Sequence, residues 1–387
     1  MSCRALLIPA LFLLAGPLSS QRAFLLETMD RPAVAVRVLA LEADGQVRVE
    51  SVGTGGWRCP LASVLSLRGE AAVAASGRNT TLELAGGSLL HGNITRESVD
   101  GFVFATARCG NLDVSLDDVL VVRFREAELP AASSADDLLL MQRGGALDKL
   151  PGEVLSVSQD GVRFKSTAGE RLFHVQRDEV VALVLRKESP RALEGGFPAR
   201  AVLKDGSLLQ GRLLAGALWR MQLTPAITVQ VDADDLVLLE PGSSRFQRLV
   251  DAPFEIKGRR GLLDGAALPA CTRREGMVAG AWRRVLHLRA PAGIALQWPQ
   301  GANEFVAQLS ANTDNLARGV QGSVRVIVRA DGRALGEELL LRARTGASIL
   351  RLAVPPETRE LEVEAAPGES FMTGARLVIL EGFMQRR

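Results

Sequence analysis

Side chains able to do chemistry are scarce in this sequence. Its 387 residues include three His, four Cys and no Tyr, and 4% are aromatic. His91, His174 and His287 fall in predicted strands with no common spacing, so we expect strand-surface positions for them rather than general bases or metal ligands. No Gly-x-Ser-x-Gly, His-Glu-x-x-His or phosphate-cradling glycine loop is present. The residue types therefore predict a protein that is not an enzyme and carries no cofactor.

The overall charge is nearly balanced. The chain has 46 basic and 44 acidic side chains, a formal net charge of +2, and 47% of its residues are hydrophobic. This is the composition of a globular protein that can bury several cores. Nucleic-acid binding needs a concentrated basic surface and aromatic rings for base stacking, and the sequence has neither. We therefore expect no nucleic-acid partner.

The first twenty residues have the order of a secretory signal peptide. Arg4 supplies a positive charge, residues 5–15 form a short apolar run, and Ser19 and Ser20 end the segment with small side chains. The run is too short to cross a bilayer, and no later stretch reaches about eighteen uninterrupted apolar residues. We expect cleavage near Ser20, export to the periplasm or the extracellular space, and no membrane span in the mature chain.

Export changes the interpretation of the cysteines. Cys59, Cys109 and Cys271 follow the signal segment and show no Cys-x-x-Cys spacing. A Cys59–Cys109 disulfide is allowed in an oxidising compartment. The alternative is that all three are small buried hydrophobic residues.

A repeated unit fills residues 30–240. Two segments share the pattern Gly-Ser-Leu-Leu-x-Gly-x-[Ile/Leu], one starting at Gly87 and the other at Gly206. In each unit an Asp-Gly or Gly-Gly pair supplies a tight turn and the following run alternates, which predicts a short antiparallel meander. Each unit ends in an apolar strand, with equivalent positions at Val64, Val119, Val180 and Leu236. We place the units at residues 30–69, 78–126, 136–187 and 198–240.

An acidic pair precedes three of these closing strands. The pairs are Asp117/Asp118, Asp178/Glu179 and Asp234/Asp235. Carboxylates in pairs can ligate calcium or act in catalysis. Because these pairs recur at one place in the repeat, we expect them to form turns instead.

The repeat resembles the Sm-like or SH3-like small barrels found in exported proteins. The resemblance rests on the pattern Asp-Gly-x-x-x-x-Gly-x-[Leu/Val] followed by a closing Val-Val-x-[Leu/Ile]. It implies a tandem of small antiparallel β-barrels. RNA binding is not carried over, because the units are slightly acidic and lack paired aromatic residues.

The pattern changes after a segment rich in Pro, Gly and Ser at residues 240–244. Strands that alternate with period two follow, separated by turns such as Asp331-Gly332, and no segment holds a helical period. Examples are residues 283–288, 304–309, 322–329, 347–354, 359–364 and 375–380. Residues 251–387 are therefore expected to form an antiparallel β-sandwich.

This last region resembles the NPCBM family of carbohydrate-binding modules. The matching pieces occur in the family's order: Asp264-Gly, Glu275-Gly276, Trp282 to Leu288, Phe305 to Leu309, and Gly322 to Gly332. The resemblance implies a galactose-binding-like jelly roll over residues 251–387. It also implies a carbohydrate or cell-surface partner.

A sugar site would need aromatic rings to stack on the sugar and polar groups to bind hydroxyls. The candidates are Trp282 and Trp298 for stacking, with Asn303, Asn312, Asp314 and Asn315 as polar groups. The alternative is that the two tryptophans fill the core and the Asn and Asp residues form turns. Asn312 and Asp314 are also candidate ligands of a structural Ca²⁺, but two oxygens do not make a site.

Taken together, the sequence predicts an all-β chain of tandem small barrels followed by a β-sandwich jelly roll. We expect an exported, non-catalytic protein that binds polysaccharide or cell-surface glycan through its last domain. The alternative is a structural or protein-interaction scaffold of the cell envelope without sugar binding. A third reading is an accessory part of a glycoside-hydrolase system.

Overall fold

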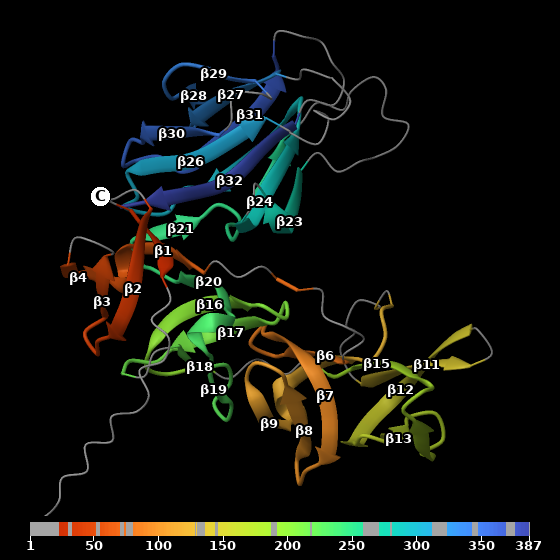
Figure 1. Ribbon diagram of the computed structural model, residues 1–387. Coiled ribbons are helices and arrows are strands. Elements are labelled where there is room, and N and C mark those ends of the chain that lie inside the picture. The colour runs from red at the N-terminus through yellow and green to blue at the C-terminus, as the bar shows by residue number, and fades with distance from the viewer. Residues whose placement is uncertain are drawn as a thin grey trace, which may run out of the picture. The chain divides into compact units, whose positions relative to one another are not determined.

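The computed structural model of the chain forms two compact units, residues 1–241 and 242–387 (Figure 1). It describes residues 23–29, 33–51, 55–69, 73–74, 80–127, 129, 136–143, 146–186, 192–216, 219–257, 271–278, 281–311, 323–342, 347–368 and 376–386. Every regular element in these stretches is a β-strand or a single-turn 3₁₀ helix, and the strands pair antiparallel. The predicted all-β class is confirmed. The predicted signal segment lies outside the described residues.

Unit 1 contains one five-stranded arrangement four times. In the first repeat, the fifth strand pairs back onto the first, giving the order β5-β1-β2-β3-β4. A 3₁₀ turn, η1 (Leu61–Ser63), separates the fourth and fifth strands. The strands are β1 (Phe24–Thr28), β2 (Val34–Leu41), β3 (Gln46–Ser51), β4 (Gly55–Pro60) and β5 (Val64–Arg68).

The other three repeats have the same strand order. The second comprises β6 (Thr80–Leu84), β7 (Leu89–Glu97), β8 (Gly101–Thr106), β9 (Gly110–Ser115), η2 (Leu116–Asp118) and β10 (Val119–Arg123). The third comprises β11 (Asp137–Arg143), β12 (Ala146–Val157), β13 (Gly161–Ser166), β14 (Leu172–Gln176) and β15 (Val180–Val184). The fourth comprises β16 (Phe197–Leu203), β17 (Leu208–Leu213), β18 (Arg220–Gln222), β19 (Thr228–Gln230), η3 (Ala233–Asp235) and β20 (Leu236–Pro241).

Alternating apolar residues of these strands form the core of unit 1. The four positions predicted to be equivalent each begin a fifth strand and are at most 2% exposed: Val64, Val119, Val180 and Leu236. Phe102, Phe104 and Phe164 are fully buried in the same hydrophobic cluster. A period of two puts such residues on one face of each short sheet.

The repeats are not closed into barrels by hydrogen bonds. Within the described residues, no pairing joins the fourth and fifth strands of a repeat. The expected Sm-like or SH3-like barrel is therefore not observed. The reason is that both edges of the fifth strand are occupied: β5 pairs with β1 and with β20, and β10 pairs with β6 and with β15.

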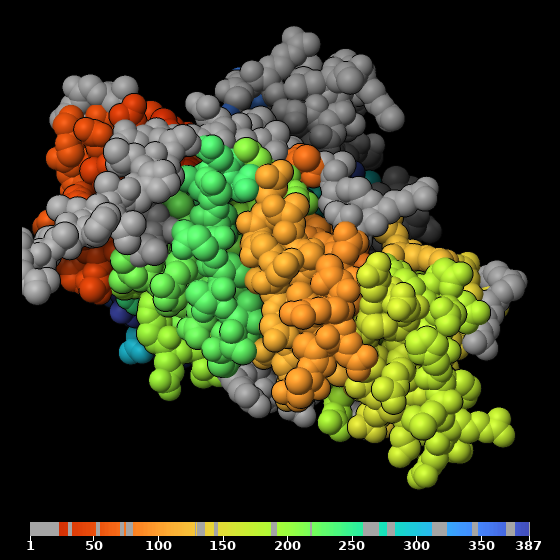
Figure 2. All heavy atoms as spheres, turned by 60° about the horizontal axis from the view of Figure 1, so that its bottom comes forward, coloured from red at the N-terminus to blue at the C-terminus, as the bar shows by residue number. Residues whose placement is uncertain are grey.

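Neighbouring repeats in space are not always neighbours in sequence. The first repeat pairs with the fourth through β5 and β20, the second pairs with the third through β10 and β15, and β7 touches β17 at Leu89 and Leu208. The spatial order is therefore first, fourth, second, third, and Figure 2 shows the second and fourth repeats side by side in orange and green.

An approximate two-fold axis at the β7–β17 contact relates the halves of unit 1. Leu239 of β20 pairs with Leu67 of β5, and Val122 of β10 pairs with Leu183 of β15 in the same register. Exchanging the second with the fourth repeat and the first with the third converts one pairing into the other. Such a two-fold requires the central contact to be self-complementary.

Unit 2 is a sandwich of two antiparallel sheets. One sheet contains β21 (Phe246–Arg248), β23 (Cys271–Val278), β24 (Ala281–Arg289), β26 (Glu304–Ala311), β30 (Ser348–Ala353) and β32 (Arg376–Gln385). The other contains β22 (Phe254–Lys257), β25 (Ala292–Gln297), β27 (Ser323–Ala330), β28 (Arg333–Ala334), β29 (Leu339–Arg342) and β31 (Glu360–Pro367). Residues of both sheets, among them Phe305 and Val363, share one buried cluster. No helix among the described residues is long and apolar enough to cross a membrane.

Candidate functional site

Trp298, one of the two predicted stacking residues, lies in the core of unit 2. Its side chain is 6% exposed, and its indole Nε1 donates a hydrogen bond to the carbonyl oxygen of Ala302 at 2.9 Å. Its backbone N–H donates to Arg359 at 2.7 Å. A ring held in this way offers no face to a sugar, so the stacking role predicted for Trp298 is corrected to a core role.

Trp282 and Asn303 lie at the same end of one sheet. Trp282 is in β24, paired with Met277, and Asn303 directly precedes β26. Both strands run antiparallel to β32, so their first residues lie at one end. Asn303 is exposed, and its backbone bonds to Gln385 and Val354 at 3.0 Å each. Two of the predicted residues therefore lie at this end of the sheet, on strands that flank β32.

The other three predicted residues, Asn312, Asp314 and Asn315, lie outside the described residues. Ala311, which precedes them, is the last residue of β26 and pairs with Leu377 at the opposite end of the sheet from Asn303. Asn303 and Ala311 therefore lie at opposite ends of β26. Spacing along the sequence could not reveal this, because it does not give the direction of a strand.

Cys59, Cys109 and Cys271 are thiols. Cys59 lies in β4 of the first repeat and Cys109 in the turn before β9 of the second, and the disulfide that the sequence allows between them is not formed. Burial raises the pKa of Cys109 to about 12, with the Asp205 carboxylate acting in the same direction. Burial also raises the pKa of Cys271 to about 11. Protonated thiols are poor nucleophiles and poor metal ligands.

The histidines lie on three different strands. His91 is in β7, with its Nδ1 3.3 Å from Thr81 Oγ1, and burial lowers its pKa. His174 is in β14 and His287 in β24. In the described part of the chain, no three His, Cys, Asp or Glu side chains are grouped as metal ligands.

The acidic pairs form turns, as predicted. Asp117 and Asp118 lie in η2, where Ser115 Oγ accepts a hydrogen bond from the backbone of Asp117. Asp234 and Asp235 lie in η3, capped in the same way by Asp232. Asp178 and Glu179 lie in the turn before β15. The second acid of two pairs also bridges repeats: Asp118 accepts from Thr224 Oγ1 and Asp235 from Arg108, each at 2.9 Å.

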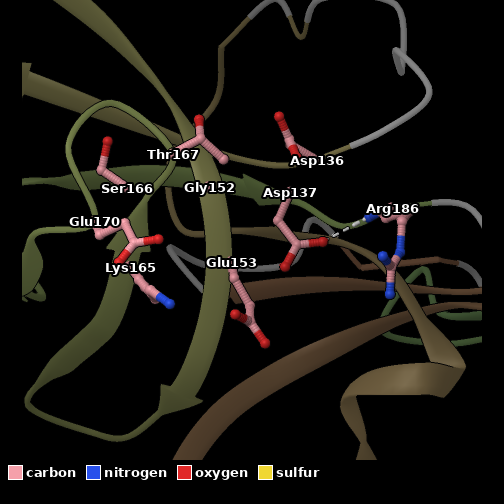
Figure 3. Close-up of a pocket in the computed structure, with 9 residues that line it drawn as sticks. All are labelled: Asp136, Asp137, Gly152, Glu153, Lys165, Ser166, Thr167, Glu170 and Arg186. Atoms are coloured by element: carbon pink, nitrogen blue, oxygen red, sulfur yellow. Dashed lines mark hydrogen bonds between the residues drawn. The ribbon is translucent and has the colours of Figure 1, made fainter.

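The structure contains a polar pocket that the sequence analysis missed. It has a volume of about 420 Å³ and lies in the third repeat (Figure 3). The lining residues come from β11 and the residue before it, from β12 and β13, and from the two segments that follow β13 and β15: Asp136, Asp137, Gly152, Glu153, Lys165, Ser166, Thr167, Glu170 and Arg186. Four carboxylates face two cationic side chains, so the lining carries a net charge of −2.

The side chain of Asp137 is held in this pocket by two hydrogen bonds from backbone N–H groups. Its Oδ2 accepts from the backbone N–H of Val154 and its Oδ1 from that of Arg186, both at 2.8 Å. The other repeats have Phe24, Thr80 and Ala199 at this register position. An alignment of the repeats on their first strands would have shown this single carboxylate.

No family model and no curated protein sequence matches the chain. Similar solved structures include the CBM51-2 and INT domains of Clostridium perfringens ZmpB in complex with GlcNAc, at 10% identity and a TM-score of 0.30 over 50% of this chain. The chain spans 39% of that structure's length. The CBM51 of Clostridium perfringens GH95 in complex with methyl-galactose has 12% identity and a TM-score of 0.26, over 36% of this chain and 99% of that one. A family 29 carbohydrate-binding module has 13% identity and a TM-score of 0.20, over 34% of this chain and 91% of that one. At these TM-scores the likenesses carry no argument about this chain.

Proposed function

We propose that the chain is an exported, non-catalytic protein whose unit 2 binds carbohydrate, either a polysaccharide or a cell-surface glycan. The observation that carries this proposal is the two-sheet sandwich of unit 2. Four of its strands, β23, β24, β26 and β27, coincide with segments that resemble an NPCBM module, and a fifth segment at Asp264 lies outside the described residues. A jelly-roll topology is part of the proposal. The proposed glycan site is the end of the sheet with Trp282 and Asn303.

The backbone geometry at this end supports such a site. Asn303 is exposed, and its backbone is held by hydrogen bonds to Gln385 and Val354. Its amide side chain therefore stands on a rigid strand end, which favours hydrogen bonding to sugar hydroxyls. Trp282 lies in β24 at the same end, and tryptophan is the residue type best suited to cover a sugar face.

The non-catalytic part of the proposal is supported by the titratable groups. The thiols of Cys109 and Cys271 are protonated at neutral pH because burial raises their pKa values. The acidic pairs that resemble catalytic carboxylates serve as turns and contacts between repeats.

A glycan array with the full chain tests the proposal. We expect the protein to bind a subset of glycans, and Trp282→Ala to lose most of that binding while Trp298→Phe, a change in the core, keeps it. If the protein binds no glycan, the proposal is wrong. Hydrolysis of a glycoside by the purified protein would overturn its non-catalytic part.

A scaffold role without sugar binding is the second candidate. The favouring observation is the way the repeats of unit 1 interlock, since both edges of β5 and β10 are paired. These pairings join neighbouring repeats through their fifth strands, while β4, β9, β14 and β19 each pair with a single strand among the described residues. Absence of glycan binding together with capture of a defined envelope protein would favour this candidate.

A further inference from the structure

Two oppositely charged residues in the pocket of the third repeat, Glu153 and Lys165, face each other without forming an ion pair. Glu153 of β12 and Lys165 of β13 are direct partners across the two strands. The first repeat has the reversed pair, Arg37 and Glu50, at the same place before its bulge, and these two form an ion pair at 4.0 Å. No ion pair joins Glu153 to Lys165 in the described part of the chain, although both line the pocket.

The remaining charged residues also line the pocket. Figure 3 shows Lys165 and Glu170 on one side of β12, Asp137 and Arg186 on its other side, and Glu153 below them. Glu170 lies in the turn after β13, with a positive φ of 51°. Asp137 contributes a negative charge that cannot swing away, because two backbone N–H groups hold its carboxylate. The pocket thus presents the exposed carboxylates of Glu153 and Glu170 beside the ammonium group of Lys165.

We propose that this pocket binds a small zwitterion with a surplus of positive charge, namely a basic amino acid or a short peptide containing one. The carboxylates of Glu153 and Glu170 receive the ammonium groups, and Lys165 receives the ligand's carboxylate. Hydrogen bonds between ionised groups are about twice as strong as those between neutral groups. A ligand with two ammonium groups and one carboxylate also complements the excess of anions in the lining.

The size and the lining agree with this class of ligand. At about 420 Å³ the pocket is at the small end of the range of about 300–1,000 Å³ for small-molecule sites. The lining residues include two hydroxyl side chains, Ser166 and Thr167, and no aromatic ring. A sugar site would be expected to contain a ring for stacking. The pocket is in unit 1, so it is independent of the glycan site proposed for unit 2.

Calorimetric titration of the full chain with three probes tests the proposal. The probes are L-lysine, cadaverine, which has both ammonium groups but no carboxylate, and hexanoate, which has a carboxylate but no ammonium group. We expect L-lysine to bind with a Kd of about 1 mM or tighter, and at least about tenfold more tightly than either other probe. No saturable binding of L-lysine would overturn the proposal. Equal binding of cadaverine would also overturn it, because only the carboxylates would then be recognised.

Two substitutions test which charged side chains of the pocket bind the ligand. We expect Glu153→Gln to weaken binding of L-lysine about tenfold. Lys165→Met should weaken binding of L-lysine by a similar factor and leave cadaverine unchanged. The matched control is Glu50→Gln, at the equivalent place in the first repeat, which should change neither affinity. If neither pocket substitution changes the affinity for L-lysine, the assignment of this site is overturned. The comparison of the three probes uses the unsubstituted protein, so it does not depend on how any variant folds.

Discussion

Ser88 and Gln210 bond to each other twice across the contact between the second and fourth repeats. Ser88 Oγ donates to the carbonyl oxygen of Gln210 and accepts from its N–H, both at 2.9 Å. On the other side of the approximate two-fold axis, Ser207 Oγ accepts from the N–H of His91 at 3.1 Å. Both serines and both partners belong to the repeated Gly-Ser-Leu-Leu-x-Gly pattern. The Gly-Ser-Leu-Leu-x-Gly pattern thus occurs in the second and fourth repeats, and its two copies lie against each other at the β7–β17 contact.

Loss of the Ser88 hydroxyl should destabilise unit 1. Ser88 is fully buried, so Ser88→Ala leaves the N–H and carbonyl of Gln210 without this partner. We expect the free energy of unfolding to fall by about 1–3 kcal/mol. Urea unfolding followed by circular dichroism measures this. Ser310→Ala, which removes a hydroxyl bonded only to the adjacent Ala311 in unit 2, is the control and should cost less. Equal stability of the two variants would contradict the importance of the contact.

Trp298 should be a stability residue of unit 2. Trp298→Ala removes a 6% exposed indole and its hydrogen bond to Ala302, so we expect a loss of about 3–5 kcal/mol. Trp298→Phe keeps most of the buried surface and should cost clearly less. Thermal unfolding of both variants provides the comparison. If the Trp298→Ala protein is as stable as the unsubstituted chain but binds glycans more weakly, the core role is contradicted and Trp298 is a binding residue.

Unit 1 should lose stability in mild acid because of His91. Burial lowers the pKa of His91 below its ordinary value of 6.5, and the neighbouring Asp205 carboxylate only partly opposes the shift. The unfolded chain therefore binds a proton more readily than the folded one, and the contribution of neutral His91 is present above about pH 6.5 and lost as the pH falls below it. Urea midpoints at several pH values measure the effect. His91→Gln should flatten this part of the pH profile, and an unchanged profile would refute the assignment.

The thiols should react slowly with alkylating reagents in the folded protein. The raised pKa values of Cys109 and Cys271 leave little thiolate at neutral pH. We expect iodoacetamide to modify them rapidly only after unfolding in urea. Mass spectrometry without reductant checks the result, and Cys59 and Cys109 should both be alkylated. A disulfide-linked peptide containing Cys59 and Cys109 would contradict the structure.

Local patterns predicted much of the fold. Period-two alternation placed strands at 283–288, 304–309 and 375–380, and the structure has β24, β26 and β32 there. The acidic pairs were placed in turns correctly, because capping and chain reversal depend on neighbouring residues. The closed barrel was not observed. Closing it would require the fourth strand of a repeat to pair with the second edge of the fifth strand. That edge goes to another repeat, at β5 with β20 and at β10 with β15.

The candidate sites were harder to predict than the strands. The burial of Trp298 depends on the facing sheet, and the separation of Asn303 from Ala311 depends on the direction of β26. The pocket around Asp137 joins residues from β11, β12 and β13 whose side chains meet only after folding.

The sequence by itself determined the strands, the turns and the fourfold repeat, because these follow from the period of apolar residues and from local hydrogen bonding. Only the tertiary structure decided which repeats touch, why the Ser88 and Ser207 segments are alike, and which charged residues line the pocket of the third repeat. These features depend on pairings between residues far apart in the chain, such as Ser88 with Gln210, and no local pattern specifies such pairings.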